Sequence, residues 1–593
     1  MKELEYPFDG EYILKKKKSI KKALLAEDKP FVDKKIAILG GSTTSDIKLI
    51  LELFLLNYGI RAEFYESEYN QYWQDAMFPN EELENFKPDI IYVHTTGRNI
   101  SEYPTITDDK QTVEDKLLGE YNRFEQMWER LFTVYQCPVI QNNFEMPGYR
   151  LMGNMEASDF HGRINFLTRL NQKFYEYAQE HSNFYINDIN YVSACYGLDK
   201  WHDDFYWHMY KYAMAVPAIP ELAFNIARIV KAIYGKNKKA LVLDLDNTLW
   251  GGVVGDDGVE NLAIGMEVPM GQVYTEFQEY LKAHKDLGVL LNVNSKNEYE
   301  NAIAGLNHPD GVLKPEDFIV IKANWDNKDR NIIDMANELN IMPDSMVFVD
   351  DNPAERTIVE TNVKGVAVPF MESPEKYIRT LDRSGFFEVT GLSADDAKRN
   401  EMYKENAKRA QLMASYENYE DYLKSLEMTG TIKAFEPVYM ARIAQLTNKS
   451  NQFNLTTWRL SQADIEAMAE DESYITLYGK LEDKFGDNGV VSVVIGKIEG
   501  STLDIKLWLM SCRVLKRDME YAMLDTLVAR ALERNITTIK GYYYPTAKNG
   551  MVKNFYGQMG FDKETEDADG NSVWTYAIDL SYNKKNKVIK VVE

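Results

Sequence analysis

The chain has little cysteine and no long apolar run, and both absences narrow its class. Three cysteines occur among 593 residues, Cys137, Cys195 and Cys512, and none stands near another. Sparse, unpaired cysteine excludes a disulfide scaffold and suits a reducing compartment. No apolar stretch approaches the length of a membrane span, and the first residues carry no apolar signal core. We therefore expect a cytoplasmic protein without a membrane partner.

Positive charge is also scarce. Lysine and arginine number 68 against 92 aspartates and glutamates, which gives a formal net charge of -24. Because a phosphate backbone would be repelled, we expect no nucleic-acid partner. The basic run at residues 15–22 is short, and a solvated helix face explains it better than a docking site does. A length of 593 residues with 45% hydrophobic content is enough for several domain cores.

Two aspartates one residue apart follow a short apolar run. Residues 240–243 have the pattern of a buried strand, and Asp244 and Asp246 come directly after it. In an open α/β sheet, the carboxyl ends of the strands border the crevice that binds ligands. Two carboxylates there suit magnesium-assisted phosphoryl transfer, because one can attack phosphorus and the other can protonate the leaving oxygen. Alone, such a pair is also compatible with ordinary turn aspartates.

Later segments place further polar groups at strand ends. A second apolar run ends at Ser295, whose hydroxyl suits a phosphate oxygen, and Lys328 opens a helical pattern. A third apolar run is followed at once by Asp350 and Asp351. The gaps between these runs leave room for crossover helices, so the sequence predicts a β-α-β-α-β layout with a parallel sheet.

The order Asp-x-Asp-x-Thr, Ser, Lys, Asp-Asp resembles the four motifs of the haloacid dehalogenase (HAD) superfamily. A phosphorelay receiver has its acidic pair before the nucleophile, whereas here the pair comes last. The resemblance implies that Asp244 forms an aspartyl-phosphate and that Asp246 is the general acid/base. Ser295 and Lys328 would hold the transferring phosphoryl group. Mg²⁺ would be bound by Asp244, by the backbone carbonyl of Asp246, by Asp350 and by Asp351.

Residues 1–234 have a strand–helix rhythm of their own. Strand patterns at residues 35–39 and 89–93 lead to Gly-Gly-Ser and Gly-Arg-Asn, and an Asp-x-x-His follows later. These places resemble blocks of the SGNH hydrolases, which implies a flavodoxin-like fold and a serine that attacks an ester. The residues carried over by position are Ser42 as nucleophile, Gly97 and Asn99 on the oxyanion side, Asp199 as orienter and His202 as base. The first block lacks the usual aspartate, so a Gly-Ser turn that caps a helix is the alternative.

Two changes of pattern divide the chain into three predicted domains, 1–234, 235–390 and 391–593. The first change follows the apolar helical pattern of residues 219–233, which ends at a glycine and a lysine-rich linker. The second precedes a charged helical pattern over residues 394–413. We expect an α/β protein with a Rossmann-like central sheet and an α+β last domain.

The last domain combines alternating strands, a long amphipathic helix and a Tyr-x-x-x-Gly-Phe ending. Residues 490–495 and 503–510 have strand patterns, residues 518–533 have the helical pattern, and another strand pattern follows. This order resembles the GCN5-related N-acetyltransferases (GNAT), which implies a site for acyl-CoA or for phosphopantetheine on a partner. Its residues would be Arg513, Lys516, Arg517 and Tyr556. The turn before the helix lacks glycine and contains an aspartate, so a degenerate domain that docks a partner is equally compatible.

The long first motif at residues 243–258, with 295–297, 349–356 and 510–515, resembles the FkbH-like branch of HAD proteins. That resemblance implies phosphate removal from a phosphorylated, glyceryl-type small acid and loading of the acyl group onto the thiol of an acyl carrier protein. No cap-sized domain separates the first two motifs, which suits a carrier-tethered substrate. Many relatives have a cysteine where this chain has Asn294. A plain small-molecule phosphatase and a catalytically weak scaffold for a carrier or biosynthetic partner are the alternatives.

Overall fold

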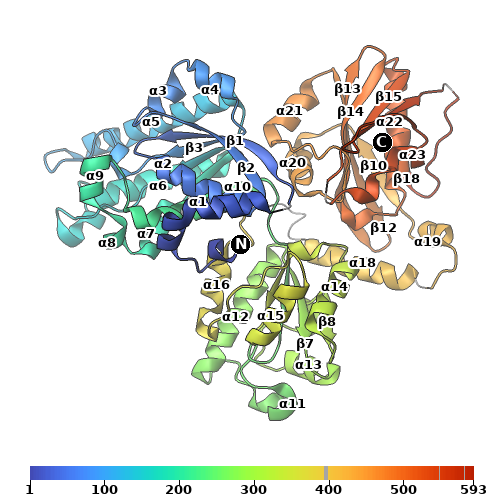
Figure 1. Cartoon of the computed structure of the whole chain (residues 1–593), viewed down its shortest axis with the longest axis horizontal. Helices are drawn as coiled ribbons and strands as arrows, with labels where there is room; N and C mark the ends of the chain where they lie inside the picture. Colours follow the sequence, from blue (N-terminus) through green and yellow to red (C-terminus); the bar gives the residue numbers. More distant parts are fainter. Residues whose placement is uncertain (28, 393–397, 414, 547, 580, 593) are drawn as a thin grey trace. The chain divides into compact units, whose positions relative to one another are not determined.

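The computed structural model describes residues 1–592 except 28, 393–397, 414, 547 and 580. The chain forms two compact units, Met1–Tyr234 with Ser461–Asp464, and Gly235–Leu460 with Ile465–Glu593. Three separate sheets account for the described strands, one in the first unit and two in the second (Figure 1). None of the described helices combines the length and the apolar character needed to cross a membrane.

A five-stranded parallel sheet forms the centre of the first unit. The strands, in the order β2-β1-β3-β4-β5, are β1 (Val32–Gly40), β2 (Ile60–Glu66), β3 (Ile90–His94), β4 (Val139–Asn142) and β5 (Phe184–Asn187). This is the strand order of flavodoxin-like folds, in which ligands bind where the order reverses, here between the ends of β1 and β3.

Helices cover both faces of this sheet because its strands are apolar on both sides. Ile36 and Ile38 of β1 pack in the cluster of α1 (Gly10–Ala26), α2 (Ser45–Asn57) and α10 (Ile219–Ile233). Ala37 and Leu39 face the opposite cluster, which contains α5 (Lys110–Tyr135) and α6 (Arg163–Glu180). The shorter helices are α3 (Tyr72–Met77), α4 (Glu81–Phe86), α7 (Ile189–Tyr196), α8 (Leu198–Trp201) and α9 (Asp204–Tyr210).

The second unit begins with a four-stranded parallel sheet of order β8-β7-β6-β9. Its strands are β6 (Ala240–Leu243), β7 (Leu290–Ser295), β8 (Val320–Ala323) and β9 (Met346–Val349). The helices are α11 (Val254–Asp257), α12 (Pro269–Asp286), α13 (Tyr299–Leu306), α14 (Lys328–Glu338), α15 (Pro353–Asn362) and α16 (Tyr377–Ser384). Because β6 lies between β7 and β9, the three strands that precede the predicted catalytic residues end side by side.

No cap domain is inserted between the first and second motifs. Residues 244–289 are all described, and between β6 and β7 they contain α11, a 3-10 turn at Val259–Asn261 and the crossover helix α12. The central sheet is therefore not roofed by an inserted domain in this segment, as the sequence predicts.

The remainder of the second unit is a mixed nine-stranded sheet. Its strands are β10 (Thr429–Lys433), β11 (Phe453–Asn454), β12 (Tyr474–Asp483), β13 (Gly486–Glu499), β14 (Thr502–Met510), β15 (Thr538–Tyr543), β16 (Asp562–Glu566), β17 (Ser572–Ala577) and β18 (Lys590–Val592). The order is β16-β17-β15-β14-β13-β12-β10-β18, with β11 paired to β14. Antiparallel pairing dominates, but β14 and β15 are parallel.

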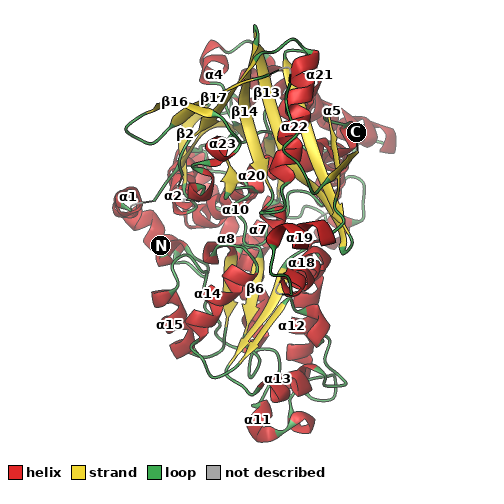
Figure 2. Ribbon diagram, turned by 90° about the vertical axis from the view of Figure 1, so that its right-hand side faces the viewer, coloured by secondary structure: helices red, strands yellow, loops and turns green. Residues whose placement is uncertain are grey.

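Helices pack on this sheet (Figure 2). The buried apolar side chains between the helices and the sheet form two clusters. The helices are α18 (Arg399–Met413), α19 (Tyr419–Ser425), α20 (Met440–Lys449), α21 (Gln462–Glu470), α22 (Met519–Glu533) and α23 (Phe555–Gln558). The helix expected over residues 394–413 is described from Arg399 onward, and residues 393–397 lie outside the described residues. β13, β14 and α22 match their predicted positions, whereas the sequence analysis did not anticipate β10 and β12.

Candidate active site

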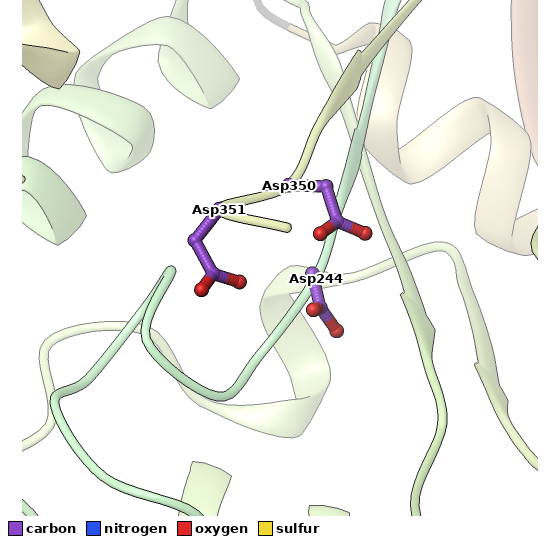
Figure 3. A group of neighbouring side chains, drawn as sticks. All are labelled: Asp244, Asp350 and Asp351. Carbon is purple, nitrogen blue, oxygen red and sulfur yellow. The ribbon is translucent and has the colours of Figure 1, made fainter. Parts of the chain in front are cut away.

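Three aspartate side chains meet at the carboxyl edge of the central sheet. Asp244 follows β6, and Asp350 and Asp351 follow the neighbouring strand β9. One carboxylate oxygen of each residue lies within 4.8 Å of the others (Figure 3). The Oδ1 atom of Asp244 is buried and has no hydrogen-bond partner. Such an oxygen is costly to bury unless something satisfies it, and oxygen ligands grouped in this way suit a hard divalent cation.

Lys328, the first residue of α14, is the cation that faces these carboxylates. Its Nζ atom lies 2.9 Å from Asp244 Oδ2 and 2.6 Å from Asp350 Oδ2, and its side chain is 3% exposed. Burial alone would lower the pKa of Lys328, but attraction to Asp244 and Asp350 outweighs burial and raises it. The lysine is therefore charged at neutral pH and is positioned to stabilise negative charge beside Asp244.

Crowding of like charges favours the neutral form of the acidic residues, whereas Lys328 is favoured in its charged form. Burial, together with repulsion from Asp244, raises the pKa of Asp350 to about 6. Burial and the same repulsion also raise the pKa of Asp351. A divalent cation among these oxygens would remove the repulsion and favour the ionised forms. Both the raised pKa values and the set of oxygen donors are therefore those expected of a divalent metal site.

Asp246 is held by three donors. Trp250 Nε1 and the backbone N–H of Val254 donate to Asp246 Oδ1 at 2.9 and 3.0 Å, and Asn297 Nδ2 donates to Oδ2 at 2.7 Å. Burial raises the pKa of the Asp246 carboxyl. No role was predicted for these three donors, although all belong to the segments that carry the family resemblance. They fix the orientation of a carboxyl group two residues beyond Asp244.

Polar residues at the neighbouring strand ends complete the site. Ser295 is buried as the last residue of β7, and Lys296 beside it forms a 2.6 Å ion pair with Glu355. Arg356 donates to the backbone carbonyls of Asp350 and Asp351 at 2.6 and 2.7 Å. Because it bonds both carbonyls at once, Arg356 stabilises the conformation of the acidic loop. This role was not predicted, since a side chain that contacts only backbone leaves no pattern in the sequence.

Asn294 occupies the place where many FkbH-like proteins have a cysteine. Its Nδ2 donates to the backbone carbonyl of Lys328 at 2.9 Å, and its Oδ1 accepts from Asn331 Nδ2 at 3.0 Å. The residue is fully buried. Asn294 therefore ties β7 to the first turn of α14 and stabilises the position of Lys328.

The predicted serine site of the first unit is brought together only in part. Ser42 follows β1, and Asn99 Nδ2 donates to the carbonyl of its neighbour Gly41 at 2.8 Å. A Cβ atom on Gly41 would lie 2.5 Å from Asn99 Nδ2, so a residue with a side chain at this place would require Asn99 to move. Asn99 thus lies beside the serine, while the Gly97 N–H points to Glu145 Oε2 at 3.4 Å.

The predicted base and its orienter are not joined to that serine. Ser42 Oγ is buried and has no hydrogen-bond partner in the structure, and His202 Nε2 lies 3.0 Å from the carbonyl oxygen of Met146. No hydrogen bond connects Asp199, in the first turn of α8, with His202 among the described contacts. The assignment of Ser42, Asp199 and His202 as a triad stays a prediction that this conformation does not assemble.

Two buried titratable residues near the ends of β3 and β4 were missed. His94 ends β3, and Tyr92 and Asn142 contact its Nδ1 at 2.9 and 3.0 Å, while its Nε2 has no partner. Burial lowers the pKa of His94 to about 4 and raises the pKa of Glu145 to about 7. Burial within a parallel sheet depends on the whole fold, so the local sequence gave no signal for either shift.

The predicted acyl-group residues of the last domain are engaged in internal contacts. Arg517 donates to Asn406 Oδ1 at 2.6 Å and to the carbonyl of Arg513 at 2.9 Å, and it lies 3.3 Å from Asp483. Burial lowers the pKa of Arg517 to about 10. Lys516 has a positive φ of 64°.

Tyr556 has a different environment from these basic residues. It is buried, its hydroxyl has no hydrogen-bond partner, and burial raises its pKa. A Cβ atom on Gly541 would lie 2.3 Å from the Tyr556 ring, so the tyrosine packs directly on β15. The turn before α22 thus follows the end of β14, and the ring of Tyr556 lies on the face of β15.

A parallel α/β domain whose central strands end in an ordered set of aspartates, serine and lysine is of the HAD type. The family model of the FkbH N-terminal domain matches residues 35–231. A solved structure, the N-terminal part of protein BF1531 from Bacteroides fragilis containing a phosphatase domain complexed with Mg, is 31% identical with a TM-score of 0.58. The match covers 63% of this chain and 99% of that chain. The chain belongs to the FkbH-like HAD proteins.

Weaker likenesses were found to N-acetyltransferase structures. The ribosomal-protein-S18-alanine N-acetyltransferase of Escherichia coli is 13% identical, with 27% of this chain and 100% of that chain covered and a TM-score of 0.21. Ard1 of Thermoplasma volcanium is 19% identical, with 25% and 98% covered and a TM-score of 0.20. No curated protein matches the chain.

Proposed function

We propose that the central domain is a magnesium-dependent phosphatase that acts through an aspartyl-phosphate on Asp244. The observation that carries this proposal is the meeting of Asp244, Asp350 and Asp351 within 4.8 Å, with the charged Lys328 bonded to two of them. The Mg²⁺ in the Bacteroides fragilis relative supports the choice of ion. Asp244, Asp350, Asp351 and the carbonyl of Asp246 would hold the ion, which would neutralise phosphoryl charge.

Each side chain then has a chemical role. Asp244 attacks phosphorus, and the bond from phosphorus to the leaving oxygen breaks. Asp246, oriented by Trp250 and Asn297, delivers a proton to that oxygen and later takes one from the water that hydrolyses the acyl-phosphate. Lys328 stabilises the charge on the transferring group. Ser295, at the end of β7, would contact a phosphoryl oxygen.

The substrate we propose is a glyceryl-type acid that carries both an acyl phosphate and a phosphate ester. The central domain hydrolyses the ester phosphate. The pantetheine thiol of a carrier protein attacks the acyl carbonyl, so that the acyl phosphate leaves as inorganic phosphate with the proton of the thiol. The family membership supports this choice, and so does the absence of an inserted cap between β6 and β7. A site that is not roofed by its own domain can accept a substrate carried on a second protein.

The decisive experiment is phosphate release by the full chain with Mg²⁺ and a panel of phosphorylated three-carbon acids. Asp244→Asn should lower release at least about a thousandfold, because the amide cannot act as nucleophile. Asp286→Asn, an exposed aspartate at the end of α12, is the matched control and should behave like the wild type. Unchanged release in a folded Asp244→Asn protein would refute the proposal. Mass measurement of an added carrier protein separates hydrolysis from acyl transfer.

A further inference from the structure

Two neighbouring strands of the C-terminal sheet pair for four residues and then separate. β14 and β15 are in parallel register from Thr502 opposite Thr538 to Ile505 opposite Gly541. Beyond this point β14 remains paired with β13 on its outer edge, and β15 remains paired with β17. Past Ile505, the edges of β14 and β15 that face each other are therefore no longer hydrogen-bonded to one another.

Residues 453–456, which we call the plug, bind the freed edge of β14. Phe453 and Asn454 form β11 and pair with Met510 and Leu509 of β14. The backbone N–H of Leu455 then donates to the carbonyl of Trp508 at 3.1 Å. The hydroxyl of Thr456 donates to the next free carbonyl, that of Lys506, at 2.7 Å.

The plug also bonds to the chain that continues β15. The backbone N–H of Tyr544 donates to the carbonyl of Leu455 at 2.9 Å. Asn549 Nδ2 donates to the carbonyl of Asn454 at 2.9 Å, and both asparagines are fully buried. The plug therefore bridges the two separated strands as an extended segment inserted between them.

The plug lies where an acyl arm would have to run. In the GNAT resemblance the anionic end of the ligand binds at the turn that follows β14, residues 513–518, and the thiol end lies near Tyr556. Tyr556 packs on Gly541, the last β15 residue that pairs with β14. An arm that joins these ends passes between the freed edges, which the plug already occupies. An amide-bearing arm would compete for the same backbone groups, because extended ligands bind free sheet edges in this way.

Aromatic packing fixes the plug against the tyrosine. The ring of Phe453 lies 5.0 Å from that of Phe555, which is the sequence neighbour of Tyr556 and lies 5.4 Å from its ring. Leu455 is fully buried. Displacing the plug would thus expose apolar surface as well as break its backbone hydrogen bonds.

The anionic end of the path is also unsuited to a pyrophosphate. Arg517 is bonded to Asn406 and Asp483 within the domain. Asp518 and Glu520 stand at the start of α22, where the positive end of a helix dipole would otherwise attract a phosphate. The Oε2 atom of Glu520 is buried without a partner.

We propose that residues 453–456 close the acyl-arm path of the C-terminal domain, so that the full chain does not bind acyl-CoA. The domain holds a segment of its own chain where an acyltransferase would hold its cosubstrate. This inference is independent of the proposed phosphatase, because none of these residues belongs to the aspartate site.

The test is a calorimetric titration of the full chain with acetyl-CoA, combined with hydrogen exchange. The wild type should show no saturable binding at millimolar acetyl-CoA, and the amides of Leu455 and Tyr544 should exchange slowly whether or not the ligand is added. Saturable binding, or faster exchange of Leu455 on addition of acetyl-CoA, would show that the ligand enters the path and would overturn the proposal.

A plug variant assigns the closure to these residues. Asn454→Gly with Leu455→Gly removes the side chains that anchor the plug. The variant should show measurable binding of S-acetylpantetheine, which has the amide-bearing arm without the pyrophosphate that the acidic turn disfavours. A folded double variant that binds no S-acetylpantetheine would overturn the role given to the plug. Phosphate release by the central domain should be unchanged, which separates this test from that of the proposed function.

A milder pair of variants applies if the double variant does not fold. Thr456→Val removes the hydroxyl bond to Lys506 at the separated end of β14 and β15. Thr537→Val removes a longer, exposed hydroxyl contact, 3.5 Å from the carbonyl of Ser501, at their paired end. Only Thr456→Val should increase the exchange rate of Leu455, by several-fold. Equal effects from both variants would contradict a plug that is held locally.

Discussion

The central site and the C-terminal acyl path lie in the same unit, and both were predicted from sequence motifs. At the central site the charged groups converge on one another and one oxygen, Asp244 Oδ1, has no partner. In the C-terminal domain the basic group Arg517 is bonded internally and the path is filled by Leu455. The difference teaches that a motif marks a candidate site only where the fold brings its groups together at one place.

Among the variants that test this comparison, Lys328→Met is expected to have the largest effect on phosphate release. Lys328 is the only described cation bonded to Asp244 and Asp350, so its loss leaves two buried carboxylates in mutual repulsion. Phosphate release should fall by about 10²–10³-fold, the range for removal of one preorganised charge-stabilising group. The protein should also lose about 3–5 kcal/mol of stability without metal, as for one partner removed from a buried ion pair.

Added Mg²⁺ gives this variant a second readout. A divalent cation among the carboxylates offsets the same repulsion, so Mg²⁺ should raise the Tm of Lys328→Met more than it raises the wild-type Tm. Equal shifts in Tm for both proteins would contradict binding of the ion beside Asp244 and Asp350.

The stability of the first unit should depend on pH through two buried groups, one that destabilises it as pH falls and one that destabilises it as pH rises toward 7. The pKa of His94 is lowered to about 4, so only the unfolded chain gains its proton as pH falls from about 6.5. Stability from His94 is therefore lost toward acid pH. The pKa of Glu145 is raised to about 7, so the folded chain keeps its proton while the unfolded chain loses it above about 4.5. Stability from Glu145 is lost as pH rises toward 7.

Each group changes the free energy of unfolding by up to about 3 kcal/mol across its window. Hydrogen exchange of the Ile36–Leu39 amides, corrected for intrinsic rates, measures the free energy of unfolding of this unit between pH 5 and 7. His94→Gln should make the unit less sensitive to acid, and Glu145→Gln should make it less sensitive to the rise toward pH 7. Shifts of the same sign in both variants would contradict these pKa directions. Neither variant should change phosphate release, because both residues lie in the other unit.

The sequence predicted three of the four strands of the central sheet, β6, β7 and β9, because each is a continuous apolar run that ends in polar residues. The edge strand β8 was not predicted. Parallel pairing then places Asp244 and Asp350 at one edge without further information. β10 and β12 were not predicted, and each contains a glycine that packing requires. A Cβ on Gly430 would lie 2.9 Å from Ile589, and one on Gly479 would lie 2.3 Å from Met519 of α22.

The state of the outer domains could not be predicted for a related reason. Whether Ser42 meets His202, or whether residues 453–456 enter the sheet, depends on contacts between segments far apart in the sequence. A local pattern specifies an element and the residue at its end. It does not specify which distant segment will satisfy that residue.

The smallest effect is expected from Asn294→Ala, and it tests how the central site stays ordered. Without the amide, the carbonyl of Lys328 loses its 2.9 Å donor, and the lysine is positioned less well against Asp244. We expect kcat to fall about tenfold with KM unchanged, because the lost orientation matters for the charge that develops during reaction. Asn292→Ala is the matched control, since Asn292 is equally buried on β7 but bonds to Leu241 and Leu290.

Asn294→Cys separates positioning from thiol chemistry at the same place. If position 294 served to hold an acyl group, the Asn294→Cys variant would transfer acyl groups to a carrier and the wild type, with asparagine, would not. If Asn294 acts by fixing Lys328, cysteine should resemble alanine in kcat, because a thiol is too weak a donor to replace the amide. A kcat equal to the wild-type value in both Asn294→Ala and Asn294→Cys would remove the positioning role and leave Lys328 held by its ion pairs alone.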